Sequence, residues 1–376
     1  MQKLRFSLMV VCVSVIVSIA TPGECGMPFL GKARKAGGDY PRIATLWGTG
    51  SQEENFKDYD VWARYDLLIL MGSEWKKGKP TRFEDLKKFR EEVARRHPGI
   101  LILGTAPLIN IPPPGRLPWM KDEWFVRFSN GKKISWWADQ VYVGNVLRDD
   151  YQEGLLNFIE GVFGRAIQAR LIDGIMFDSV VGGLSWLTRD ADTNLDGKAD
   201  DIAEVDTLWV QAQNRFLEKL RKRFPGIKIH VNDVDERHSP FVNGRYFEGR
   251  MLLDRMVRGA ASPQDVIQVL NNWNEHGVQP GDTIATMTHP LGWQGWRAGY
   301  GKEVTRPAEV DLVKRDFTRM RLGLLTTLMT DAYFEYDLGT VWWGNPAYWF
   351  AEFDAPLGRP LGPGREVLAG TPGLVL

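Results

Sequence analysis

Eight short apolar runs alternate with amphipathic segments along most of the chain. The runs cover residues 43–47, 66–71, 100–104, 172–177, 227–231, 245–247, 283–287 and 332–334. Their apolar residues are continuous rather than alternating with polar ones, as in parallel strands that are covered on both faces. Helical periodicity predicts the longer helices at about 81–97, 150–169, 206–224, 262–277 and 307–329.

This alternation predicts a (β/α)8 barrel over residues 40–355. An open, doubly wound sheet is the alternative. It is disfavoured because residues 47–50, after the first strand, contain only two glycines and no helix signal follows closely. The segment 124–137, with a turn at Asn130-Gly131, predicts a small β-hairpin inserted after the third strand.

The N-terminus has the pattern of an export signal. Lys3 and Arg5 precede a mostly apolar stretch over residues 6–19 that ends in small residues, with Ala20 at the exit. This predicts a signal peptide over residues 1–20 and a secreted or periplasmic protein that leaves the membrane after cleavage. The stretch is shorter than the ~20 apolar residues of a membrane span, although an uncleaved anchor is the alternative.

Composition narrows the function classes. Lys and Arg together number 47, as do Asp and Glu, so no basic surface for nucleic acid is expected. With Cys12 in the predicted signal peptide, Cys25 remains alone and cannot form an internal disulfide. Many of the fifteen tryptophans lie in loops rich in Gly and Pro, where their flat faces suit sugar rings. Packing at the barrel rim is the alternative for many of them.

Residues 21–39 are a lead segment, and the tail 356–376 is rich in Gly and Pro.

Two carboxylates are the best catalytic candidates. Barrel enzymes carry their catalytic groups at the C-terminal ends of the strands. Asp178 ends the fourth run and Glu248 the sixth, so both should point into the barrel mouth. Two facing carboxylates are the minimum for glycoside hydrolysis. Helix capping or an ion pair, for example with Arg250, is the alternative, and Glu335 and Asp337 are possible substitutes.

Other residues at strand ends are candidates for binding substrate. These are Trp47, Asn232, His289, Trp293 and Tyr336. For His289 a hydrogen bond at the rim is an equal alternative. Asp173 precedes its strand and is expected to be structural, whereas Asp233 and Asp235 are more typical of loop charges or ligand contacts than of the catalytic pair. The sequence has no Ser-His-Asp elbow, nucleotide-binding loop or His-rich metal signature, and no organic cofactor is expected.

The segment 192–200 resembles the first half of an EF-hand loop. Oxygen ligands recur at every second residue, with a glycine at the turn: Asp192, Asn194, Asp196, the carbonyl of Lys198, and Asp200. Ala203 stands where an EF-hand has its bidentate glutamate, so the shorter loops of extracellular proteins are the better match. The pattern predicts one bound Ca²⁺ close to Asp178; a solvated acidic turn is the alternative.

Several motifs, in this order, resemble the glycosyl hydrolase-like family fifteen. They are residues 41–47, 59–61, 65–67, 173–178, 246–248, 333–337 and 357–362. The resemblance spans roughly residues 40–370 and implies a TIM barrel with glycosidase activity, distantly similar to polygalactosaminidase-like barrels. Such families close with a strand like Glu-Asn-Gly-x-Val-x-Val-Asn-Pro, which this sequence lacks before Leu376, so a truncated tail is expected.

Together these patterns predict a secreted glycoside hydrolase that cleaves a polysaccharide or glycan with two carboxylates. By analogy with barrel glycosidases that use strands four and six, Asp178 is the nucleophile and Glu248 the acid, which favours retention of configuration. A non-catalytic carbohydrate-binding barrel is the alternative from another class. A barrel esterase or deacetylase is disfavoured because the nucleophile or metal set is missing.

Overall fold

The computed structural model describes residues 39–46, 58–70, 83–136, 139, 141–232, 235–248, 252–288, 317–337 and 349–359. Eight parallel strands form one sheet, in the order β1 (Ala44–Leu46), β2 (Leu67–Leu70), β3 (Leu101–Pro107), β7 (Gly174–Asp178), β8 (Lys228–Asn232), β9 (Gly244–Phe247), β10 (Ile284–Thr288) and β11 (Tyr333–Asp337). A parallel bridge between Ile43 and Phe334 joins the last strand to the first. The sheet is therefore closed, and the predicted (β/α)8 barrel is confirmed.

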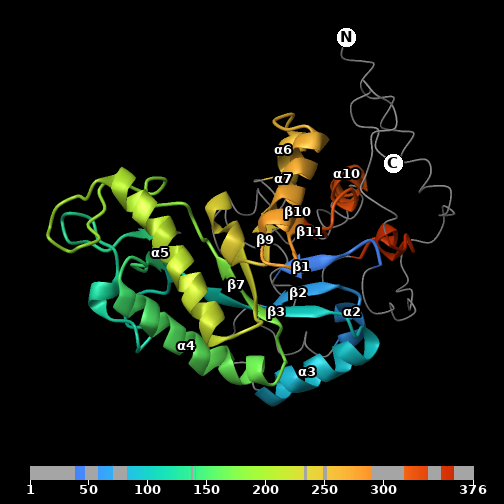
Figure 1. Cartoon of the computed structure of the whole chain (residues 1–376), viewed down its shortest axis with the longest axis horizontal. Helices are drawn as coiled ribbons and strands as arrows, with labels where there is room; N and C mark the ends of the chain where they lie inside the picture. Colours follow the sequence, from blue (N-terminus) through green and yellow to red (C-terminus); the bar gives the residue numbers. More distant parts are fainter. Residues whose placement is uncertain are drawn as a thin grey trace, which may run out of the picture.

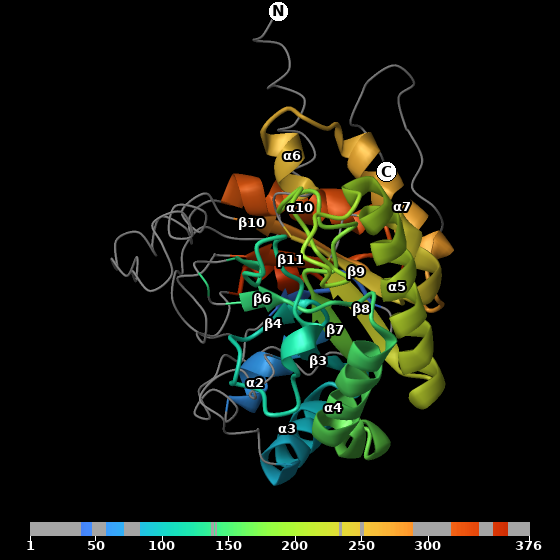
Figure 2. The same cartoon turned by 90° about the vertical axis from the view of Figure 1, so that its left-hand side faces the viewer.

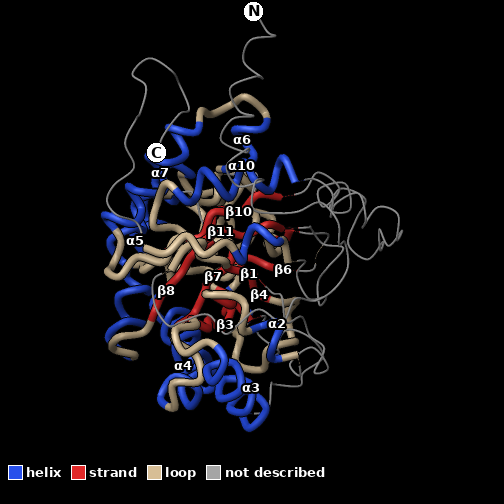
Figure 3. The backbone as a smooth tube through the Cα atoms, turned by 90° about the vertical axis from the view of Figure 1, so that its right-hand side faces the viewer, coloured by secondary structure: helices blue, strands red, loops and turns tan. Residues whose placement is uncertain are grey.

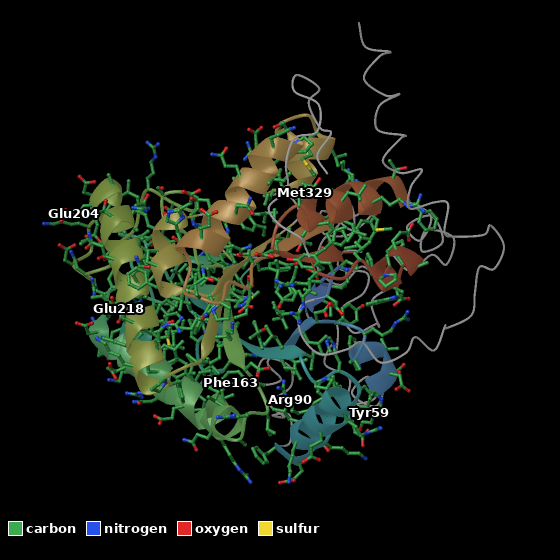
Figure 4. The ribbon with its side chains drawn as sticks, turned by 45° about the vertical axis from the view of Figure 1, so that its right-hand side comes forward. Tyr59, Arg90, Phe163, Glu204, Glu218 and Met329 are labelled. Atoms are coloured by element: carbon green, nitrogen blue, oxygen red, sulfur yellow. The ribbon has the colours of Figure 1, made fainter. Side chains whose placement is uncertain are left out.

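Helices surround the strands (Figure 1). They are α2 (Tyr59–Trp62), α3 (Phe83–Arg96), α4 (Asp149–Gln168), α5 (Ile202–Arg223), α6 (Leu253–Val257), α7 (Pro263–His276) and α10 (Phe317–Leu328), with short 3₁₀ helices η3 (Asp122–Trp124), η4 (Glu236–Phe241) and η6 (Ala351–Asp354). The helix α5 shows why they form: Trp209 and Phe216 are fully buried, whereas Glu204 and Glu218 lie on its exposed side (Figure 4). Such a helix is held mainly by its apolar face.

Side chains alternate between the two faces of the barrel wall. The inner cluster consists of Ala44, Leu67, Ile69, Leu103, Met176, Tyr246, Ile284 and Tyr333. A larger core of buried side chains fills the layer between the strands and the helices. Figure 3 shows the helices around the central strands. At Gly104 a Cβ atom would lie 2.7 Å from the ring of Phe163, so the glycine lets α4 pack closely on β3.

An insertion follows β3. A small antiparallel sheet has the order β4 (Asn110–Ile111), β6 (Val141–Val143) and β5 (Ser135–Trp136). The predicted turn is present, with Gly131 at a φ of 83° and a bridge from Arg127 to Lys133. The hairpin is thus one part of a larger insertion, whose strands β4 and β6 lie together at one side of the barrel (Figure 2).

The predicted signal peptide and residues 21–38 lie outside the described residues, as do residues 360–376 of the tail. Where the tail is described, the carbonyl of Gly358 accepts a 2.8 Å hydrogen bond from the amide of Tyr40, so this segment pairs antiparallel beside the first strand. Among the described helices, none combines the length and the apolar character that crossing a membrane requires.

Candidate active site

Asp178 and Glu248 both lie at the C-terminal ends of barrel strands, on the inner face. Met176 and Tyr246, two residues earlier on the same strands, belong to the inner cluster, and side chains two residues apart share a face. Both carboxylates are partly buried. The strands β7, β8 and β9 are neighbours, and Asn232 pairs in register with Tyr246. The fold therefore brings both carboxylates to one mouth.

Neutral donors surround Asp178. The amide of Asn232 donates to Oδ1 of Asp178 at 2.9 Å, and Ser179 donates from both its main chain and its hydroxyl. Burial raises the pKa of Asp178, and these hydrogen bonds oppose the rise. Ser179 has a φ of 55°, a left-handed conformation that is uncommon for a residue with a side chain. This conformation turns the chain immediately after Asp178, as often occurs at functional sites.

Three acidic residues act electrostatically on the buried hydroxyl of Tyr246. The side chain is 2% exposed. Burial raises its pKa above the usual value, and the charges of Glu335, Asp337 and Glu248 raise it further. The charges of these three carboxyl groups therefore all reach the buried hydroxyl of Tyr246.

Glu335 is the most buried acid of this group, at 5% exposed. It accepts hydrogen bonds from the main-chain N–H of Leu46 at 2.5 Å and from Oγ1 of Thr286 at 2.9 Å. A third hydrogen bond comes from Tyr246. Burial, followed by the charge of Asp337, raises the pKa of Glu335 to about 7. The sequence named this residue only as a substitute.

The predicted substrate-binding residues have different positions. Asn232 is 8% exposed, and its Oδ1 has no hydrogen-bond partner within the described part of the chain. Tyr336 lies on the opposite face of β11 from Glu335, and its ring packs against Phe350 with 5.4 Å between centroids. The structure thus buries Tyr336 in the outer layer, which contradicts its prediction as a residue that binds substrate.

Trp47, His289 and Trp293 lie outside the described residues. Trp136 and Trp186 are two of the loop tryptophans that the sequence singled out, and they form a pair with 4.9 Å between ring centroids. Trp186 is 56% exposed and lies in the loop after β7, eight residues beyond Asp178. An aromatic surface of this kind suits the apolar face of a sugar.

Acids away from the mouth have structural partners. Asp173 at the start of β7 forms a 2.8 Å ion pair with Arg90, which extends from α3 (Figure 4), and also accepts the amide of Ile102. Asp235 caps η4 by accepting the amide of Arg237 at 3.0 Å. Both observations agree with the roles expected from the sequence. Asp233 and Arg250 lie outside the described residues.

The acidic loop 192–200 folds back on itself. Asp192, which is 2% exposed, accepts the amides of Asp196 and Gly197 at 3.1 and 3.0 Å. Asn194 also accepts the amide of Asp196, and Asp196 accepts that of Lys198, both at 2.9 Å. Asp200 accepts the amide of Thr193 at 2.6 Å. These bonds wrap the loop around its own oxygens.

The donor set fits a hard, oxygen-loving cation such as Ca²⁺. In the described residues, however, no three His, Cys, Asp or Glu side chains converge on one point as around an ion. The loop is anchored to the segment inserted after β3, since Arg127 and Asp192 bond reciprocally between main chains and the amide of Asn145 donates to the carbonyl of Thr193.

Comparison with known families identifies the chain. The sequence profile described as "Hypothetical glycosyl hydrolase family 15" matches residues 118–371, more than half of the chain. The protein belongs to this family. No curated protein sequence matches the chain significantly. Family membership supports a glycosidase and agrees with the resemblance found in the sequence.

Solved structures with similar folds include several glycosidases. The glycoside hydrolase domain of PelA from Pseudomonas aeruginosa aligns with 12% identity and a TM-score of 0.44, over 81% of this chain and 96% of that one. An α-amylase from Anoxybacillus aligns with 12% identity and a TM-score of 0.49, over 83% and 76%. The α-galactosidase AgaA from Geobacillus stearothermophilus aligns with 12% identity and a TM-score of 0.46, over 82% and 40%. These likenesses are too remote to assign a substrate or a residue.

Proposed function

We propose that this family member hydrolyses glycosidic bonds with Asp178 and Glu248 as its two carboxylates. The observation that carries the proposal is the placement of both residues on the inner face of the barrel mouth, at the ends of β7 and β9. Barrel enzymes use this end of the strands, and hydrolysis of a glycoside needs one acid and one base or nucleophile.

The surroundings of Asp178 suit a nucleophile. Burial raises the pKa of Asp178, and the amide of Asn232 and the two donors of Ser179 limit this rise by stabilising the carboxylate. In this assignment Asp178 attacks or stabilises the anomeric carbon, and Glu248 protonates the leaving oxygen. Glycosidases with a nucleophilic carboxylate retain the anomeric configuration, and their carboxyl groups lie about 5 Å apart.

A polysaccharide or glycan is the proposed substrate. The exposed ring of Trp186 can stack on a sugar. Asn232 stays a candidate for binding substrate, since its buried Oδ1 has no hydrogen-bond partner in the described part of the chain. A carbohydrate-binding barrel without activity would share these features but would not need acid–base chemistry. We further propose export with cleavage near Ala20 and one Ca²⁺ held by the loop 192–200, which would steady the segment after β7.

The test is hydrolysis of a panel of polysaccharides by the purified protein, with the anomeric configuration of the first product followed by NMR. Release of reducing ends by the parent, and its loss in Asp178→Asn and Glu248→Gln, is the expected result. Binding of a polysaccharide without any turnover in the parent would favour the binding protein instead. An inverted first product would reassign Asp178 as the base that activates water.

A further inference from the structure

Glu335 is a buried acid that the proposed two-carboxylate mechanism does not use. It lies on β11, two residues before Asp337 on the same inner face. Its carboxyl group accepts the N–H of Leu46, the hydroxyl of Thr286 and the hydroxyl of Tyr246. Buried polar groups need such partners, because an unmade hydrogen bond there is costly.

The partners of Glu335 come from strands far apart in the sequence. Leu46 is the last residue of β1, Thr286 lies in β10, and Tyr246 lies in β9. One carboxyl group therefore joins four strands, close to the seam that the bridge between Ile43 and Phe334 closes. Tyr246 lies two residues before Glu248, so the hydrogen bond from Tyr246 ties Glu335 to the strand that ends at the mouth.

We infer that Glu335 is a positioning residue of the catalytic mouth, which fixes the upper ends of β1 and β9 and sets the electrostatic surroundings of Glu248. This inference rests on the proposed function. The groups that face Glu335 in the described structure are Tyr246 and, through it, Glu248 on β9, the threonines of β10, Asp337 on β11, and Tyr65 before β2.

The charge of Glu335 changes close to neutrality, because burial and the charge of Asp337 bring its pKa to about 7. Below this pH the group is neutral and adds no charge beneath the mouth. Above it, the carboxylate opposes ionisation of Glu248, since like charges disfavour each other. An acid at Glu248 then keeps its proton to a higher pH, which extends activity on the alkaline side.

The first experiment needs no substrate. Infrared difference spectra of the parent between pH 5 and 9 should show a protonated carboxyl band that disappears with a midpoint near 7. Because the proposed acid Glu248 is also protonated in this range, the band of Glu335 is the part that Glu335→Gln loses and Asp282→Asn keeps, Asp282 being a buried carboxylate at the other end of the barrel. A band unchanged in Glu335→Gln overturns the inference.

Hydrogen exchange tests the positioning role. The amide of Leu46 should exchange slowly in the parent and in Glu335→Gln, whose side-chain oxygen can still accept it, and faster in Glu335→Leu. Equal protection in all three overturns the role. If Glu335→Leu does not fold, Glu335→Asp replaces it, because its shorter side chain also draws the acceptor away from Leu46.

The third experiment uses whichever substrate the parent cleaves. In Glu335→Gln the alkaline limb of kcat/KM should move down by about one pH unit, while Asp282→Asn leaves it in place. An unmoved limb in Glu335→Gln overturns the coupling to Glu248. Failure of the proposed function gives a different result, namely no hydrolysis at any pH while the infrared band and the amide protection behave as expected.

Discussion

At the N-terminal end of the barrel, Asp282 lies against Lys228 and His230, whereas at the C-terminal end Asp178 lies against Asn232 and Ser179. Burial alone would raise the pKa of Asp282, but His230 and Lys228 outweigh it and the pKa is lowered. Asp178 has only neutral donors among the described residues, and its pKa is raised. An aspartate is thus an ionised partner of Lys228 at one end of the barrel, and a carboxyl group with a raised pKa at the other end.

The two aspartates differ in whether their surroundings favour stability of the fold or catalysis. An acid paired with a cation stays ionised and cannot exchange protons near neutrality. An acid held by neutral donors in a low-dielectric site has a raised pKa instead, a shift that is common at catalytic sites. Glu335 follows the second pattern, with Leu46, Thr286 and Tyr246 as neutral donors. We therefore expect substitutions at the C-terminal end of the barrel to lower activity, and substitutions at the N-terminal end to lower stability.

The largest expected effect is on catalysis at the mouth. Asp178→Asn should lower kcat by roughly 10²–10⁴-fold, because the carboxylate that attacks or stabilises the reacting carbon is gone. Its urea-unfolding free energy should stay within about 1 kcal/mol of the parent, since Asn keeps the shape and part of the hydrogen bonding. Near-full activity in a folded variant would refute the assignment and redirect attention to Asp337.

The second effect is on stability at the opposite end. Asp282→Asn leaves Lys228 without its carboxylate partner, which should cost about 3–5 kcal/mol in urea unfolding. Activity per folded molecule should remain. A cost below about 1 kcal/mol would show that the pair contributes no more than a surface ion pair. The proposed difference between a stabilising end and a catalytic end of the barrel would then be refuted.

The third effect is a pH dependence that Glu335→Gln removes. The folded protein holds a proton on Glu335 up to about pH 7, whereas the unfolded chain releases it near the ordinary value of 4.5. The folded state therefore binds more protons between these values, and stability falls as pH rises through this window, by up to about 3 kcal/mol. In thermal melts, the melting temperature of Glu335→Gln relative to that of the parent should be higher at pH 8 than at pH 5. A constant difference would contradict a raised pKa.

The smallest effect concerns calcium. If the loop 192–200 binds Ca²⁺, a chelator should lower the melting temperature by a few degrees, because a ligand that binds only the folded state stabilises it. Asp192→Asn should remove this response. Equal melting curves with and without chelator, and no metal by elemental analysis, would leave the loop as a self-bonded acidic turn.

All eight strands could be predicted from the sequence, because strands buried on both faces read as continuous apolar runs. The predicted ends of helices were less accurate than the predicted strands where a capping side chain decides where a helix begins. The helix α5 begins at Ile202 rather than near 206, since Asp201 accepts the amides of Ala203 and Glu204. The short helix α6 was missed because five residues show no helical period. The strands β4 and β6 are likewise too short to show alternation.

The sequence located the inward carboxylates, but not their partners. The contacts of Glu335 with Leu46 and Tyr246 join positions that no local pattern connects. Tyr336 was a different kind of error. It lies between Glu335 and Asp337, and strict alternation along β11 already implies that it faces outward if they face inward.

The antiparallel contact between Tyr40 and Gly358 has a consequence for the connectivity of the chain. The start and the end of the described barrel meet there, with 2.8 Å between the donor nitrogen and the acceptor oxygen. A short peptide could link the two ends, and new termini could be opened in an exposed connection such as the turn at Gly226, between α5 and β8. Such a circular permutant should still form the barrel, because the order of the strands around the axis does not depend on where the chain begins.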